Sequence, residues 1–108
     1  MATLQHKLST VLTTDLLKVG EDVSDVKYIS IANIDDNLAA TINLLLNKGD
    51  DNYYLIKNYR LHVGETLFLN KDNNIEFDNS ADGFSLRLQT QNDAGTAIKI
   101  HVVITRGL

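Results

Sequence analysis

The fold class is decided by two stretches near the end of the chain, Phe84-Ser85-Leu86-Arg87-Leu88-Gln89-Thr90-Gln91 and Ile98-Lys99-Ile100-His101-Val102-Val103-Ile104. In both stretches every second side chain is apolar, and the side chains between them are mostly polar. A period of two places the apolar side chains on one face of a pleated strand, which no helix can do. Both stretches are therefore predicted to be half-buried β-strands.

The rest of the chain repeats this pattern in short apolar runs separated by polar turns. The sequence has no proline, and eleven Asn, eleven Asp and six Gly supply the turn residues. Most connections are too short for crossover helices, so neighbouring strands are expected to pair antiparallel. We predict an all-β fold, an antiparallel β-sandwich (jelly-roll-like) of about eight strands. Its predicted core contains Ile29, Ile31, Ile42, Leu44, Leu86, Leu88, Ile98, Ile100 and Val102.

The N-terminal part is less regular than the remainder. Residues 1–23 are predicted to form an N-terminal arm or edge segment, and residues 24–108 the β-sandwich domain. Asp15 to Val19 fits either a strand or a helical turn, because Leu12, Leu16 and Val19 also have helical spacing. Residues 74–77 are expected to form a brief strand.

Composition excludes several classes of protein. With 108 residues and no cysteine, the chain is expected to be one domain without disulfides, thiolate nucleophiles or cysteine-bound metals. A net charge of −4 argues against nucleic-acid binding, which needs a basic surface. The longest aliphatic run, Leu44-Leu45-Leu46, is far shorter than the ~20 residues that span a bilayer, and Met1 to Thr14 has no signal-peptide core. We expect a soluble protein made in a cytoplasm, with no membrane partner.

No arrangement of residues in the sequence predicts catalysis or metal binding. His6, His62 and His101 lie on three distant segments without partners at ligand spacing. The segment 72–78 has oxygens at alternate positions but lacks the glycine of a calcium loop. Nucleophile-elbow and glycine-rich phosphate motifs are absent. We therefore expect no enzymatic activity, no cofactor and no metal.

Several apolar side chains have the wrong parity for a single core. They are Leu45, Tyr53, Tyr54, Phe68 and Val103, whose neighbours in the sequence are already assigned to the inner face or cannot share it. An exposed set of this kind is typical of a partner surface, and these residues are our interface candidates. The alternative is that loops or the N-terminal arm cover them. Exposed Tyr53, Tyr54 and Tyr59 are the only residues that could serve a carbohydrate-binding module.

The order of these runs resembles a known group of proteins. The resemblance is carried by Tyr28-Ile29-Ser30-Ile31-Ala32-Asn33, Ala40-Thr41-Ile42-Asn43-Leu44-Leu45-Leu46, Tyr53-Tyr54-Leu55-Ile56-Lys57-Asn58, Leu61-His62-Val63-Gly64-Glu65-Thr66-Leu67-Phe68-Leu69 and Ile75-Glu76-Phe77. This succession is similar to small β-sandwich virion structural proteins of tailed bacteriophages, particularly those of cyanobacterial and other marine phages. It covers roughly residues 24 to 106.

The resemblance implies a capsid decoration (cement) protein that stabilises the phage head by binding its shell. Its partners would be the major capsid protein and further copies of itself. A homo-oligomer, most often a trimer, would form through the interface candidates and the arm from Met1 to Thr14. The protein would be located in the virion, which assembles in the host cytoplasm. The alternatives are a neck, tail or fibre component, or a carbohydrate-binding β-sandwich module.

Overall fold

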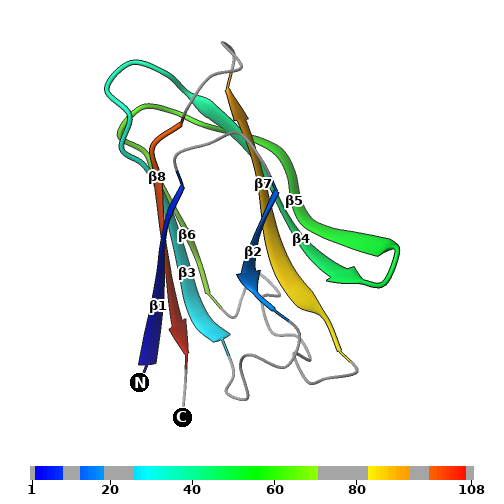
Figure 1. The fold of residues 1–108 in the computed structure, drawn as a ribbon. Helices are drawn as coiled ribbons and strands as arrows, with labels where there is room; N and C mark the ends of the chain where they lie inside the picture. The colour runs from blue at the N-terminus through cyan, green and yellow to red at the C-terminus, as the bar shows by residue number, and fades with distance from the viewer. Residues whose placement is uncertain (1, 9–12, 19–25, 71–82, 93–97, 107–108) are drawn as a thin grey trace.

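The chain folds into two facing β-sheets. The computed structural model describes residues 2–8, 13–18, 26–70, 83–92 and 98–106. These residues form the strands β1 (Ala2–Leu8), β2 (Thr13–Leu17), β3 (Val26–Asn33), β4 (Ala40–Lys48), β5 (Asp51–Leu61), β6 (Thr66–Leu69), β7 (Ser85–Asn92) and β8 (Ile100–Arg106). One sheet has the order β1-β8-β3-β6 and the other β2-β7-β4-β5 (Figure 1).

The connectivity is that of a jelly roll. Every described strand pairing is antiparallel, and the chain passes to the other sheet after each strand except at the β4–β5 hairpin. Eight strands in two sheets linked in this order are typical of double-sheet jelly rolls. The predicted antiparallel sandwich of about eight strands is confirmed.

The core lies between the sheets and is built by alternation along each strand. All nine residues predicted for it belong to one buried cluster, to which Leu61, Leu69 and Ile104 also contribute. Ile29, Ile42, Leu88 and Ile100 are completely buried. The inward side chains of two twisted sheets interdigitate in this way in any sandwich, so the period of two in the sequence determines which face of each strand is buried.

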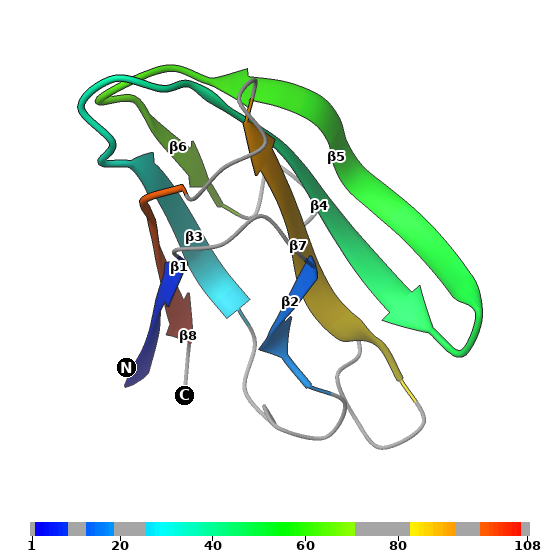
Figure 2. The ribbon, with the colours of Figure 1, turned by 45° about the horizontal axis from the view of Figure 1, so that its top comes forward.

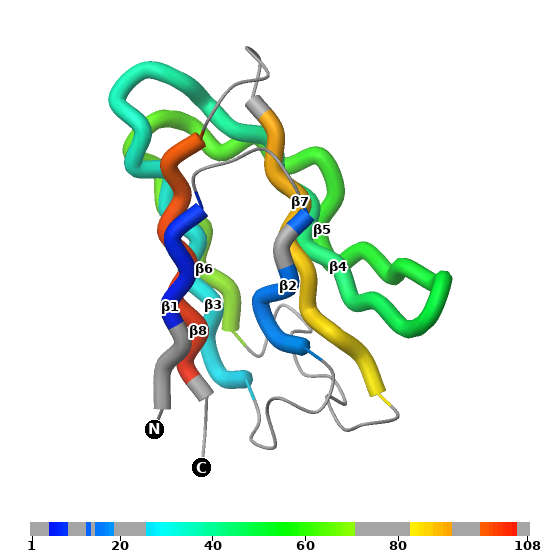
Figure 3. The backbone as a smooth tube through the Cα atoms, in the orientation of Figure 1, coloured from blue at the N-terminus to red at the C-terminus, as the bar shows by residue number. Residues whose placement is uncertain are grey.

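The residues predicted as an arm or edge segment contain β1 and β2, one outer strand of each sheet. β1 lies beside β8 and β2 beside β7 (Figure 3). The stretch that fitted either a strand or a helical turn is a strand as far as Leu17. Its register shifts between Asp15 and Leu17, so a β-bulge buries Leu16 and Leu17 together. The predicted strand at 74–77 lies outside the described residues.

The β4–β5 hairpin projects from the side of the sandwich, as the green segments of Figures 1 and 2 show. Its two-residue turn begins at Gly49 with φ 61°, a left-handed conformation that glycine adopts without strain and that hairpin turns need. Among the described strands, β5 is an outer strand that pairs with β4 alone. Two register shifts against β4 make β5 irregular, and Asn58, with φ 56°, lies within the first of them.

Asn33, at the end of β3, joins the two sheets. Its buried side chain donates from Nδ2 to the carbonyl oxygens of Leu38 and Leu61, both at 3.0 Å, and Oδ1 accepts from the Asp35 backbone N–H at 3.0 Å. Since Leu61 ends β5 in the other sheet, this amide holds the crossing from β3 to β4 in place.

Candidate interaction surface

The three histidines remain apart in the structure. His6, on β1, lies 3.0 Å through its Nε2 from the backbone oxygen of Leu16, so it bridges the outer strands of the two sheets. His62 is exposed in the turn after β5, and His101 lies on the outward side of β8. Within the described ranges no three His, Asp or Glu side chains come together as metal ligands. The segment 72–78 lies outside those ranges.

Asp35 and Glu65, two carboxylates whose pKa values are lowered, accept hydrogen bonds from backbone N–H groups in turns. Hydrogen bonds from the backbone N–H groups of Asn37 and Leu38 lower the pKa of Asp35. Glu65 accepts from the His62 backbone N–H at 2.8 Å and from the Tyr59 hydroxyl at 3.0 Å. These bonds lower the pKa of Glu65, and the same carboxylate raises the pKa of Tyr59. Tyr59 also packs against the core and is partly buried, so its ring is less exposed than those of Tyr53 and Tyr54.

Leu45 does not supply exposed apolar surface, contrary to the expectation from strand parity. It has the outward parity of β4, yet only 1% of its surface is exposed. Its partners across the neighbouring strands are Tyr54 and Arg87, whose long side chains stand on the same face. Strand parity predicts the direction in which a side chain points, but not the size of its neighbours. Leu45 therefore points outward as predicted and is nevertheless buried.

Tyr53 and Tyr54 point to opposite faces of their sheet, as their adjacent positions require. Tyr53 is opposite inward-facing Leu46 and makes an edge-to-face contact with Phe84 at 5.8 Å between ring centroids. Tyr54 is on the outer face, with the Lys57 ammonium 4.9 Å from its ring centroid. About half of Tyr53 and 42% of Tyr54 are exposed.

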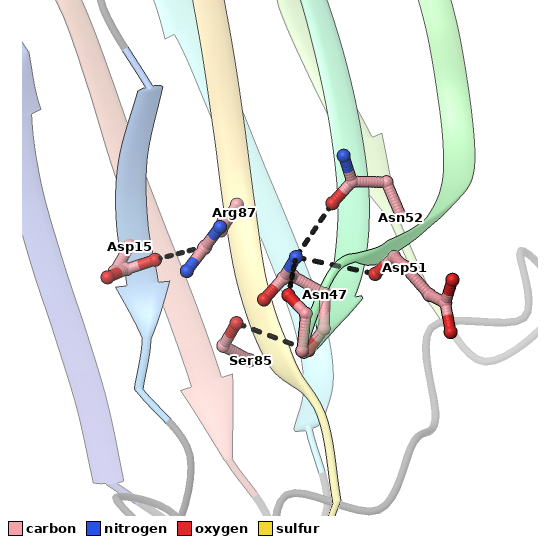
Figure 4. A network of polar contacts seen from close by, with 7 residues as sticks. Asp15, Asn47, Asp51, Asn52, Ser85 and Arg87 are labelled. Carbon is pink, nitrogen blue, oxygen red and sulfur yellow. Dashed lines mark hydrogen bonds and ion pairs between the residues drawn. The ribbon is translucent and has the colours of Figure 1, made fainter.

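The outer face around Tyr54 is polar, and its side chains pair with one another. Arg87 Nε donates to Asp15 Oδ1 at 2.6 Å, and Asn43 Nδ2 donates to Gln89 Oε1 at 3.1 Å. Figure 4 shows the ion pair between β2 and β7. Since these groups already satisfy one another, a partner would have to displace existing contacts.

The outer face of the other sheet is different. We call it the Phe68 face, and define it as the outward side chains of β1, β8, β3 and β6. They are Gln5, Lys7, Tyr28, Ser30, Ala32, Thr66, Phe68, His101, Val103 and Thr105. Phe68 is 55% exposed and stacks on Tyr28, itself 42% exposed, with 5.5 Å between ring centroids. Val103 and Phe68 flank Ser30 in one row across the sheet.

The Phe68 face carries no acidic side chain among the described residues, although the chain has a net charge of −4. The groups on it that can carry a positive charge are Lys7 and His101, which are opposite each other on β1 and β8. Small side chains fill most of the remainder. The face is thus neutral to basic, and apolar along the edge formed by Tyr28 and Phe68.

Two of the interface candidates, Phe68 and Val103, therefore share one face, and their aromatic neighbour Tyr28 is not among the candidates predicted from the sequence. The sequence does contain a signal for Tyr28: Ile29 and Ile31 are predicted to face inward, and strand alternation then places Tyr28 on the outer face. What the sequence did not contain was the pairing of β3 with β6, which places Tyr28 beside Phe68.

Among the residues that the structure describes, no helix has the length and apolar character needed to cross a membrane. In sequence, the chain matches no protein-family model and no curated protein.

Two solved structures are similar to this chain. The first is the Yersinia pseudotuberculosis-derived mitogen, with a TM-score of 0.51 and 15% identity over 98% of this chain and 85% of that chain. The second is the infectious bursal disease virus Gt strain, with a TM-score of 0.34 and 12% identity over 98% of this chain and 28% of that chain. At these identities the likeness to the mitogen concerns the fold alone, and the likeness to the virus protein supports no further conclusion.

Proposed function

We propose that this chain is a virion structural protein of a tailed bacteriophage, and specifically a decoration protein that binds the outside of the assembled head. One observation carries the proposal: the Phe68 face presents two stacked, half-exposed aromatic rings on the outer side of a sheet. Contiguous exposed apolar surface of this kind is typical of a protein-binding site. The sequence resemblance to small phage virion proteins supports the same role.

Decoration requires a rigid body with an adhesive surface. The jelly roll supplies the body, because its outward residues stand on strands held by a fully buried core. Each copy would contribute one modest contact to the shell, and contacts between neighbouring copies would add through multivalency.

Binding to shells that lack the protein tests this function. Such shells are mixed with the purified protein and sedimented, and we expect the wild-type protein in the pellet. A Tyr28→Ala/Phe68→Ala variant should remain in the supernatant, because it loses both rings of the face. Val63→Ala is the matched control, since Val63 is an exposed apolar residue outside the Phe68 face. A wild-type protein that does not sediment with shells would contradict the proposal.

Copy number then separates decoration from a neck, tail or fibre role. Quantitative mass spectrometry of purified virions compares this chain with the major capsid protein. A decoration protein is present at a constant ratio to the capsid subunits, whereas a neck or tail component is present in only a few copies per particle.

A carbohydrate-binding role is the second candidate, and it is favoured by Tyr53. Its half-exposed ring is held edge-to-face by Phe84, so it could stack against the apolar face of a sugar. A glycan array followed by titration of Tyr53→Ala tests it: binding that this substitution abolishes, in a protein that ignores shells, would favour the second function.

A further inference from the structure

The Phe68 face has a counterpart elsewhere on the same chain, at the tip of the β4–β5 hairpin. The tip consists of Lys48, Gly49, Asp50 and Asp51, all of them exposed. The Lys48 ammonium lies 5.5 Å from the Phe84 ring centroid, over the inner side of the sheet. Asp50 and Asp51 are therefore the charges that the tip presents, and exposed Tyr53 and Tyr54 follow them on β5.

The tip is held in one conformation by Asn47. Its Nδ2 donates to the backbone oxygens of Gly49 and Asp51, both at 3.3 Å, and to Asn52 Oδ1 at 2.8 Å (Figure 4). Ser85 Oγ donates to the Asn47 carbonyl oxygen at 3.4 Å and so ties the base of the tip to β7. A segment ordered in advance loses little conformational entropy when it binds.

The two surfaces are complementary in charge and composition. The tip is acidic and bordered by tyrosines, whereas the Phe68 face has no described acidic side chain, carries Lys7 and His101, and exposes two aromatic rings. The hairpin belongs to one sheet and the Phe68 face is the outer side of the other, with the core between them. One molecule cannot bring its own tip to its own face.

We propose that the β4–β5 hairpin tip of one copy docks on the Phe68 face of a second copy. Complementary potentials guide and orient such a contact, and the aromatic rings supply its apolar centre. The contact joins two different surfaces, so it is head-to-tail, and it generates a closed ring or an open chain according to the rotation between copies. The contact goes beyond the proposed function: the tip and the shell would use the same face, so the contact joins copies that are not bound to a shell, and a shell would compete with it.

Two single variants and their matched controls test the contact in solution, by sedimentation velocity over a concentration series. Asp50→Lys reverses the charge of the tip, and Phe68→Glu places an acid on the face. Asp36→Lys makes the same charge change in another exposed turn, and Val63→Glu makes the same replacement at an exposed apolar position outside the face. We expect each test variant to weaken self-association by about tenfold or more, and each control to change it by less than about twofold.

Mixing the two variants whose self-association is weakened is the most discriminating experiment. The Asp50→Lys protein keeps an intact face and the Phe68→Glu protein an intact tip, so the mixture should form a one-to-one heterodimer that grows no further. This recovery also shows that both variants are folded. A monomeric wild-type protein at high micromolar concentration, an Asp50→Lys variant that associates normally, or a mixture that stays monomeric would each overturn the contact. The Asp50→Lys protein keeps an intact Phe68 face and should still sediment with shells, so failure of the contact and failure of the proposed function are distinguishable.

Discussion

Replacing Asn33 by alanine should destabilise the protein far more than the same replacement of an exposed polar residue would. The side chain is 2% exposed and makes three hydrogen bonds, to the Leu38 and Leu61 carbonyl oxygens and to the Asp35 backbone N–H. At a net ~1 kcal/mol for each bond, the loss is about 3 kcal/mol. The bond to the Leu61 carbonyl is the one that water is least able to replace, because Leu61 is fully buried.

Urea denaturation of Asn33→Ala measures this loss as a change in the free energy of unfolding. Asn37→Ala is the matched control, since Asn37 is an exposed residue of the same connection and only its backbone N–H is used in the turn. Asn33→Asp is nearly isosteric but replaces the amide donor by a carboxylate facing two carbonyl oxygens, so we expect it to be at least as destabilising at neutral pH. If Asn33→Ala costs less than about 0.5 kcal/mol, as an ordinary surface substitution does, the role assigned to the amide is wrong.

Three further predictions concern the core, the hairpin and the turn before β6. Ile100→Ala should cost ~2–5 kcal/mol in the same assay, because Ile100 is completely buried and truncation leaves a cavity; a loss below about 0.5 kcal/mol would contradict its place in the core. Gly49→Ala should cost ~1–2 kcal/mol through its φ of 61° alone, since no atom lies within 4 Å of the added methyl group, and Gly49→Asn should recover part of that loss. The lowered pKa of Glu65 means that its contribution to stability is present above its ordinary value of 4.5 and is lost as the pH falls below it. Glu65→Gln should therefore lower the stability at neutral pH and flatten its decline on acidification, and an unchanged pH profile would show that the carboxylate is not involved.

The buried side of the sandwich was predictable from the sequence because burial follows strand parity. Ile98, Ile100 and Val102 alternate with outward residues, and each lies in the core cluster as expected. Strand parity alone did not determine which side chains are buried at two places, one where the parity is broken and one where neighbours cover an outward side chain. A bulge buries Leu16 and Leu17 together, and long neighbours enclose Leu45 on the outer face. Neither feature has a local signal.

The candidate surface was less predictable than the core, because it depends on which strands pair. Phe68 and Tyr28 are forty residues apart in the sequence and meet only because β6 adds to β3 at the edge of its sheet. The same holds for Asn33, which looks like an ordinary strand-end residue until β5 brings the Leu61 carbonyl to it. Hydrophobic periodicity contains no information about such partners.

The irregular course of β5 affects the tendency of the protein to aggregate. A straight outer strand of eleven residues would offer an unbroken row of free N–H and C=O groups, on which strands of other molecules could add without limit and form insoluble aggregates. The two register shifts, with Asn58 at φ 56° in the first, bend β5 and interrupt the even spacing that cross-molecule pairing needs. The kinked edge is thus expected to hinder amyloid-like stacking of β5 strands from separate molecules.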